Sequence, residues 1–265
     1  MAGFRFCSLS SSSIHGNSYF VETPGGVRLL VDCGVPIRRL ERYLDGMGVS
    51  PPSISAVFIT HGHRDHTAAL DLRTPFAEKY GVPVYATRGF WDSWTPRGDL
   101  DQGLRHIVVP GTPVDFGQCN VTAFLKPHDC AEPVGYTVRC GDRSLSIVTD
   151  LGCVPASVAE AVRDSEYLVF ESNHDREMEL NSGRSRWLIY RVLSDIGHLS
   201  NEQTAHALSR IASACTRVVL LSHLSLECNS PEIALHTAVP ALSRRSAARL
   251  EVAPPDRPSA MFGDD

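Results

Sequence analysis

The chain has 265 residues, of which 43% are hydrophobic and 21% are charged, and its net charge is −5. This composition excludes long disordered segments, and the charge excludes a general electrostatic attraction to nucleic acid. No apolar run approaches the roughly 20 residues that span a bilayer, so we expect no membrane partner and predict a cytoplasmic protein. The length suits one large core, and we predict one domain over residues 1–253.

The first third of the chain predicts antiparallel strands at residues 4–9, 17–22 and 27–32, with a turn at Pro24-Gly25-Gly26. A helix is expected over residues 37–47. Phe90, Trp91 and Trp94 follow at near-helical spacing, which favours core packing over stacking on bases. The eight cysteines contain no CxxC pair, so we expect mostly reduced thiols and no disulfide framework.

Strands and helices alternate in the rest of the chain, which indicates an α/β fold. Ser200 and Gln203 have capping-box spacing at the start of a helix over residues 201–214. The Pro-rich segment at residues 254–265 predicts a loose tail. The other expected strands cover residues 84–86, 107–109, 121–126, 134–140, 144–149, 167–170 and 218–221, and the other expected helices cover residues 155–163 and 185–194.

A cluster of metal-binding residue types follows a predicted buried strand at residues 56–60. The segment His61-Gly62-His63-Arg64-Asp65-His66 places three imidazoles and a carboxylate within six residues. Residues at the end of a strand lie on loops where ligands converge, and imidazole and carboxylate groups bind divalent metals. A solvated polar loop is the less favoured alternative.

Such a cluster needs ligands from elsewhere, because each divalent ion takes roughly four to six of them. His128, Asp150 and His223 each come directly after, or shortly after, a predicted strand. Strand ends at one edge of a sheet gather their side chains in one crevice. Each of these residues alone favours a structural role, but together with the cluster they indicate coordination.

This set of residues resembles the two-metal hydrolases of the metallo-β-lactamase fold, a four-layer αββα sandwich. The resemblance implies two divalent ions, zinc or alternatively manganese. It also implies that one ion is held by His61, His63 and His128, the second by Asp65, His66 and His223, and that Asp150 bridges the two.

Two further segments, Phe170-Glu171-Ser172-Asn173-His174-Asp175 and Gly197-His198-Leu199-Ser200-Asn201, resemble those that tRNA 3′-processing endonucleases of this fold carry beside their metals. With Phe6-Cys7-Ser8-Leu9 and residues 223–229, they resemble more closely the bacterial YycJ/WalJ group. That resemblance runs from about residue 4 to about residue 229. It implies a 5′ to 3′ DNA exonuclease linked to mismatch repair.

For such a reaction we expect Asp65 to accept a proton from the attacking water. His198 would donate to the phosphate or the leaving oxygen, and Glu171 would hold His198 in the productive tautomer. His174 and Asn201 are candidates for substrate binding, with a structural role as the alternative for His174. The loop at residues 10–17 departs from the group by an extra Ile-His, so Ser12 and His15 are further substrate-binding candidates, with a plain surface loop as the alternative.

Other functions stay open. A thioester or lactone hydrolase of the same fold is the main alternative, a non-catalytic scaffold is disfavoured because all seven ligand positions are filled, and RNA is the alternative to DNA. Arginines at positions 38, 39 and 42, and at 184, 186 and 191, are more typical of solvated helix faces than of phosphate tracks. The oligomeric state has no sequence signal.

Overall fold

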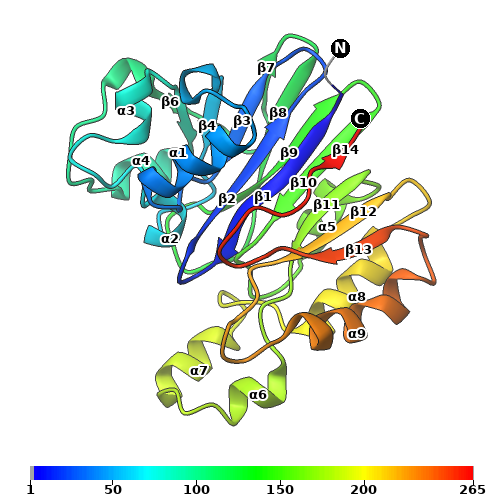
Figure 1. Cartoon of the computed structure of the whole chain (residues 1–265). Coiled ribbons are helices and arrows are strands. Elements are labelled where there is room, and N and C mark those ends of the chain that lie inside the picture. The colour runs from blue at the N-terminus through cyan, green and yellow to red at the C-terminus, as the bar shows by residue number, and fades with distance from the viewer. Residues whose placement is uncertain (1–2, 265) are drawn as a thin grey trace. The chain divides into compact units, whose positions relative to one another are not determined.

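A mixed sheet begins the chain in the computed structural model, which describes residues 3–264. Its strands have the order β14-β1-β2-β3-β4-β5-β6 (Figure 1). Strands β1 to β3 pair antiparallel, which confirms the predicted opening, and β3 to β6 pair parallel. The strands are β1 Arg5–Ser12, β2 Gly16–Glu22, β3 Arg28–Val31, β4 Ala56–Phe58, β5 Val84–Ala86, β6 Arg105–Ile107 and β14 Phe262–Gly263.

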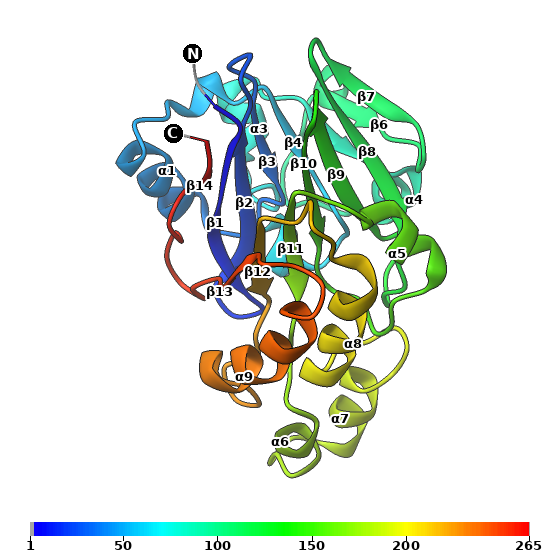
Figure 2. The ribbon, with the colours of Figure 1, turned by 90° about the vertical axis from the view of Figure 1, so that its right-hand side faces the viewer.

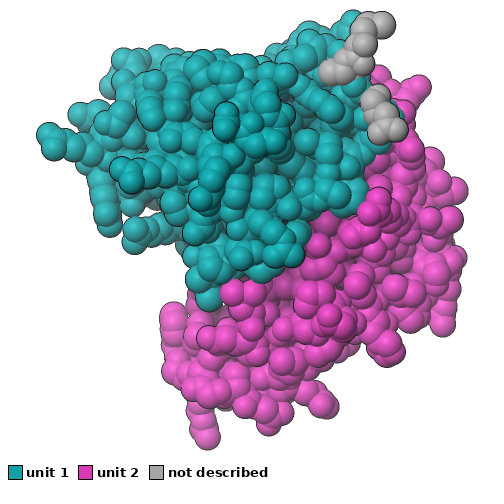
Figure 3. All heavy atoms as spheres, in the orientation of Figure 1, with its two compact units in different colours: residues 1–123, 130–134, 254–265 teal, residues 124–129, 135–253 magenta. Residues whose placement is uncertain are grey.

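The chain divides into two compact units (Figure 3). Unit 1 consists of Met1–Ala123, Cys130–Val134 and Pro254–Asp265, and unit 2 consists of Phe124–Asp129 and Gly135–Ala253. Each unit has its own hydrophobic core. The single domain over residues 1–253 stays a prediction.

Short helices pack on the sheet of unit 1. Leu40 and Leu44, four positions apart on α1, enter its core together with Phe76 of α3 and Val57 of β4. The aromatic cluster at residues 90–94 packs there too, as predicted. The helices are α1 Ile37–Gly46, α2 Arg64–Thr67, α3 Phe76–Tyr80 and α4 Arg88–Ser93, with 3-10 turns η1 Pro51–Ser53 and η2 Gln102–Leu104. A hairpin of β7 Pro113–Phe116 and β8 Cys119–Leu125 follows.

Unit 2 is built on strands that run side by side in the order β9, β10, β11, β12, β13. The first pair is antiparallel, and the remaining pairs are parallel. Parallel strands end at the same edge of a sheet, so residues that follow β10, β11 and β12 become neighbours. The strands are β9 Val134–Cys140, β10 Arg143–Val148, β11 Tyr167–Glu171, β12 Val218–Ser222 and β13 Arg249–Val252.

Three helices of unit 2 pack on this sheet through one apolar core (Figure 2). Ser200 and Gln203 form the predicted capping box at the start of α8, although that helix ends three residues earlier than expected. The two short helices α6 and α7 lie at the lower end of unit 2 in Figure 1. The helices are α5 Ala156–Val162, α6 Arg176–Leu180, α7 Arg186–Val192, α8 Asn201–Ile211 and α9 Pro231–Leu242.

The C-terminal segment has defined contacts, so the prediction of a loose tail is wrong for the described residues 254–264. Strand β14 pairs antiparallel with β1, and Phe262 stacks on Phe6 with ring centroids 5.3 Å apart. Ser10 Oγ donates to the carbonyl of Pro255 at 2.7 Å. The prolines break regular structure, but the open edge of β1 offers hydrogen-bond partners that a local pattern cannot reveal.

Six cysteines are not in a disulfide, at positions 7, 33, 130, 153, 215 and 228. Cys119 and Cys140 are disulfide-bonded, and the other six agree with the expectation of mostly reduced thiols. Among residues 3–264, no helix is long and apolar enough to cross a membrane.

Candidate metal centre

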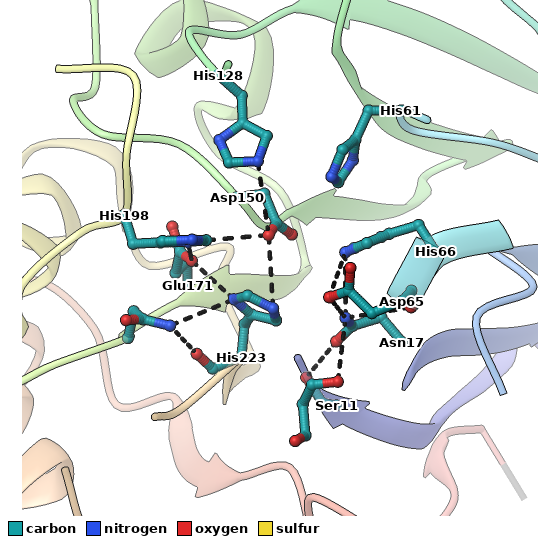
Figure 4. A network of polar contacts seen from close by, with 12 residues as sticks. Ser11, Asn17, His61, Asp65, His66, His128, Asp150, Glu171, His198 and His223 are labelled. Atoms are coloured by element: carbon teal, nitrogen blue, oxygen red, sulfur yellow. Dashed lines mark hydrogen bonds and ion pairs between the residues drawn. The ribbon is translucent and has the colours of Figure 1, made fainter. Parts of the chain in front are cut away.

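The predicted metal-binding cluster is drawn together within unit 1. The strand before it, β4, stops at Phe58, and the cluster continues through a loop into α2. The ring centroid of His61 lies 4.0 Å from that of His66 and 4.8 Å from that of His63. His66 Nε2 is 3.5 Å from Asp65 Oδ2 (Figure 4). His61 and His66 are fully buried, so their imidazoles have little freedom to move.

Asp32, which directly follows β3, orients His66, and the sequence analysis did not single it out. Its fully buried carboxylate accepts from His66 Nδ1 at 2.7 Å, and from Thr60 N and Oγ1 at 2.8 and 2.9 Å. Nδ1 of His66 therefore carries the proton, and Nε2 is the unprotonated nitrogen of the ring. The available signal was an Asp at a strand end, the same signal that Asp150 gave.

Asn17 on β2 is a second contributor that sequence reasoning missed. Its amide Nδ2 donates to Asp65 Oδ2 at 3.1 Å and lies 3.1 Å from His66 Nε2 (Figure 4). The contact holds the Asp65 carboxylate in one orientation. No spacing rule connects Asn17 with Asp65, because the two are 48 positions apart.

Unit 2 gathers the remaining predicted residues at the ends of its parallel strands. Asp150 follows β10, Glu171 ends β11 and His223 follows β12. Together with His198, they offer ligand atoms that all lie within 4.8 Å of one another. Asp150 Oδ1 is 3.4 Å from His223 Nε2 and 3.9 Å from His128 Nε2 (Figure 4). The expected gathering at strand ends is confirmed within this unit.

Three of these strand-end residues have left-handed backbone conformations. The φ angles are +63° at Asp32, +59° at Asp150 and +57° at His223. Such conformations cost free energy for residues other than glycine and concentrate at functional sites, where they aim a side chain. The same strained conformation recurs at three separate strand ends. This indicates that the fold orients these side chains at a cost in backbone conformational free energy.

Glu171 is the centre of the hydrogen-bond network in unit 2. Its Oε1 accepts from Nδ1 of His198 at 2.8 Å and from Nδ1 of His223 at 3.0 Å. Its Oε2 accepts from the backbone N–H groups of Leu151 and Leu199. Burial raises the pKa of the Glu171 carboxyl, but the nearby His198 charge and the two imidazole hydrogen bonds outweigh burial, so the pKa falls to about 2. Glu171 is thus an anion that orients both imidazoles.

His128 is held by a different partner. Its Nδ1 donates to the carbonyls of Ile196 and Gly197 at 3.1 and 3.2 Å. This bond fixes the tautomer in which Nε2 is unprotonated. The same hydrogen-bonding arrangement occurs at three imidazoles: Nδ1 of His128, His198 and His223 each donates to an oxygen of the protein.

Two of the predicted substrate-binding residues, His174 and Asn201, are fully buried, and their role in substrate binding stays a prediction. His174 is 0% exposed, burial lowers its pKa, and neither ring nitrogen has a hydrogen-bond partner among the described residues. Asn201 is 0% exposed and exchanges hydrogen bonds with Asn229 and Ser172. The Ser172–Asn201 hydrogen bond and the bridge between His174 and Ser200 connect the two motif segments.

The N-terminal loop gives a different result. Ser12 is buried, and its Oγ accepts from the backbone N–H groups of Ile14 and His15, which shapes the turn. His15 is half-buried and lines a cavity of about 390 Å³ in unit 1, together with Arg64 and Asp65. Substrate binding by Ser12 and His15 stays a prediction, and the position of His15 beside Asp65 agrees with it.

The sequence of this chain matches the model of the β-lactamase superfamily domain over residues 27–224. The match covers more than half of the chain, so the protein belongs to the β-lactamase superfamily and is a metal-dependent hydrolase, as predicted. Divalent metal ions are the cofactors that this family implies. Each unit, taken by itself, clusters imidazole and carboxylate groups, which are donors that suit such ions.

Within the superfamily, the protein belongs with the WalJ and YycJ proteins. It is 35% identical over 246 residues to "Exodeoxyribonuclease WalJ" of Streptococcus pneumoniae serotype 2, which covers 91% of this chain and 89% of that protein. It is also 35% identical over 234 residues to "Exodeoxyribonuclease YycJ" of Bacillus anthracis, which covers 88% of this chain and 86% of that one.

Solved structures confirm the predicted metallo-β-lactamase fold, of the αββα class. The metallo-β-lactamase fold protein YhfI from Bacillus subtilis matches with a TM-score of 0.72 and 16% identity, over 98% of this chain and 99% of that one. The short form of human tRNase Z matches with a TM-score of 0.64 and 15% identity, over 97% and 98%. At these identities the likeness concerns the fold alone.

Proposed function

We propose that this protein is a two-metal phosphodiesterase that degrades DNA from the 5′ end, and that DNA, with RNA as the alternative, is its partner. The observation that carries the proposal is the Glu171 network, in which one buried carboxylate orients His198 and His223. Two relatives at 35% identity, both named exodeoxyribonucleases, support a nuclease role over nearly the whole chain.

The ligand assignment is part of the proposal. The supporting observation is that His66, His128 and His223 each have Nδ1 bound to a protein oxygen, which favours the tautomer with an unprotonated Nε2, the form of imidazole that binds cations. Zinc suits this nitrogen-rich set best, and manganese is the alternative. We assign His61, His63 and His128 as the ligands of one ion and Asp65, His66 and His223 as the ligands of the other. Asp150 would be a ligand of both ions.

Bound divalent ions would lower the pKa of water from 15.7 to about 7 and neutralise charge on the phosphate. The side chains then divide the proton transfers. Asp65, held by Asn17, accepts the proton of the attacking water. His198 has its Nδ1 on Glu171, so as an imidazolium, with both ring nitrogens protonated, it would donate from Nε2 to the phosphate or the leaving oxygen. Glu171 stays ionised and positions His198.

The test is a digestion with defined ends. With Mn²⁺ or Zn²⁺ added, we expect a 5′-phosphorylated DNA strand labelled at its 3′ end to shorten progressively, because a 5′ to 3′ enzyme reaches the label last. Treatment with EDTA should abolish the reaction, and added metal should restore it. Immediate release of the label as a mononucleotide would show digestion from the 3′ end and contradict the proposed 5′ to 3′ direction. Consumption of a thioester in place of DNA would favour the small-molecule hydrolase.

A substitution at Asp32 tests whether its carboxylate fixes the tautomer of His66. We expect Asp32→Asn to weaken metal binding by about 10- to 100-fold, because the charged acceptor that fixes the His66 tautomer is lost. Titration of the metal-free protein with zinc, in competition with a chelating dye, measures the effect. Asp115→Asn, an exposed change on β7, is the matched control. Equal affinity in both variants would contradict the role of Asp32.

A further inference from the structure

A group of large apolar side chains is exposed on the segment that contains α6 and α7. It consists of Met178, Leu180, Trp187, Tyr190 and Ile196, which are 37%, 50%, 72%, 70% and 49% exposed. No other stretch of similar length among residues 3–264 exposes as many. Concentrated exposed apolar surface marks a binding surface more often than chance exposure.

The two aromatic rings have one face of α7 in common. Trp187 and Tyr190 are three positions apart, so they are neighbours on the helix surface, whereas Ile189 and Val192 on the opposite side are buried. The rings therefore do not hold the helix to unit 2. The other two tryptophans differ, because they pack against the core of unit 1.

Residues 175–196 carry four arginines and four carboxylates in total, but the charged residues of α7 itself are both arginines. Residues 180–194 contain three arginines and no carboxylate. Arg184 pairs with Glu179 and Glu227, and Arg191 pairs with Asp129, so these two anchor the helices and do not form a phosphate track. Arg186 is exposed beside Trp187 and has no ion pair with any residue that the structure describes. The Arg186 guanidinium is therefore an exposed cation next to the exposed rings of Trp187 and Tyr190.

The segment is attached at both ends to the candidate site of unit 2. The chain enters it three residues after Glu171 and leaves it at His198, and His174 and Ser200 form a β-bridge at its base. Its last residues, Ile196 and Gly197, accept the hydrogen bonds that orient His128. A ligand on α7 would therefore be held on the same short stretch of chain as the proposed catalytic imidazole.

We propose that the outer face of α7, made of Arg186, Trp187 and Tyr190, is a stacking platform for single-stranded nucleic acid. Aromatic rings accept any base face, and a neighbouring guanidinium suits the phosphate backbone, so this surface binds strands without sequence preference. The inference rests on the proposed function and names the form of its substrate: an unpaired strand held by its bases on α7.

Binding is measured by the fluorescence anisotropy of a labelled 12-nucleotide thymidine strand, with EDTA present so that no cleavage occurs. We expect Trp187→Ala and Tyr190→Ala each to raise Kd by about tenfold, and Trp187→Phe and Tyr190→Phe to restore most of the affinity, because they keep a ring. Arg186→Ala should reduce the slope of log Kd against log salt by about 0.7, the loss of one phosphate contact. Val239→Ala, an exposed apolar change on α9, should have no effect.

Cleavage of a small phosphodiester separates this inference from the proposed function. We expect the α7 variants to hydrolyse bis(p-nitrophenyl) phosphate like the unaltered protein, and to show a raised KM for a DNA strand with little change in kcat. Strand affinity that is equal in all variants, or absent in the unaltered protein, would overturn the platform. A second result would also overturn the platform: substitution of the rings changes the molecular mass measured by light scattering but leaves the strand affinity unchanged. The surface would then be an interface between copies of the chain. Strand binding that depends on the rings, without cleavage of any phosphodiester, would refute only the proposed function.

Discussion

Replacing His198 by alanine is expected to lower the turnover of a phosphodiester by about 10²- to 10⁴-fold, the range for loss of a positioned acid or base. His198 is 11% exposed and has Nδ1 on Glu171, so it presents only Nε2 to a ligand. Bound metal, measured by elemental analysis, should stay unchanged, because the assigned ligands are intact. His206→Ala, an exposed change on α8, serves as the control.

A Glu171 variant provides a second test of the His198 role, because Glu171 is proposed to act by positioning His198. Each Glu171 oxygen accepts two N–H groups, so the amide nitrogen of Glu171→Gln meets two donors whichever way the amide is turned. If the carboxylate positions His198, its substitution should add little to the loss already caused by His198→Ala, and a double-mutant cycle reads this coupling. Additive losses would refute the positioning role. Loss of metal in His198→Ala would make His198 a ligand.

Asp150→Asn is expected to abolish binding of two ions per chain and to lower turnover by at least about 10³-fold, or about 4 kcal/mol of lost metal-ion stabilisation. Asp150 Oδ1 lies 3.4 Å from His223 Nε2, 3.8 Å from His198 Nδ1 and 3.9 Å from His128 Nε2, so three imidazoles surround one carboxylate oxygen. Asparagine is the informative replacement, because it tolerates the φ of +59° at this position and removes only the charge.

Elemental analysis of the purified variant tests the bridging assignment. Asp142→Asn, an exposed change in the turn between β9 and β10, is the matched control. Two ions still bound to Asp150→Asn, together with unchanged turnover, would remove Asp150 from the proposed centre. Loss of folding is followed separately by circular dichroism, so that unfolding is not mistaken for loss of a ligand.

Motifs within a few residues were readable from the sequence. Residues 61–66 are close in space in almost any conformation, and a capping box spans three positions, so local spacing was enough to predict both. Strand-end positions also pointed to Asp150 and His223, because parallel strands bring their ends to one edge of a sheet.

Contacts between distant positions were decided only by the tertiary structure. Asp32 and Asn17 reach His66 across 34 and 49 positions, and their roles depend on strand register. His174 and Asn201 belong to motif segments, yet the fold buries them; Trp187 and Tyr190 resemble ordinary helix residues, yet the fold exposes them. The amino-acid sequence by itself therefore determined which chemical groups this hydrolase has. The tertiary structure decided which of them face a ligand, because the direction of a side chain depends on what packs around it.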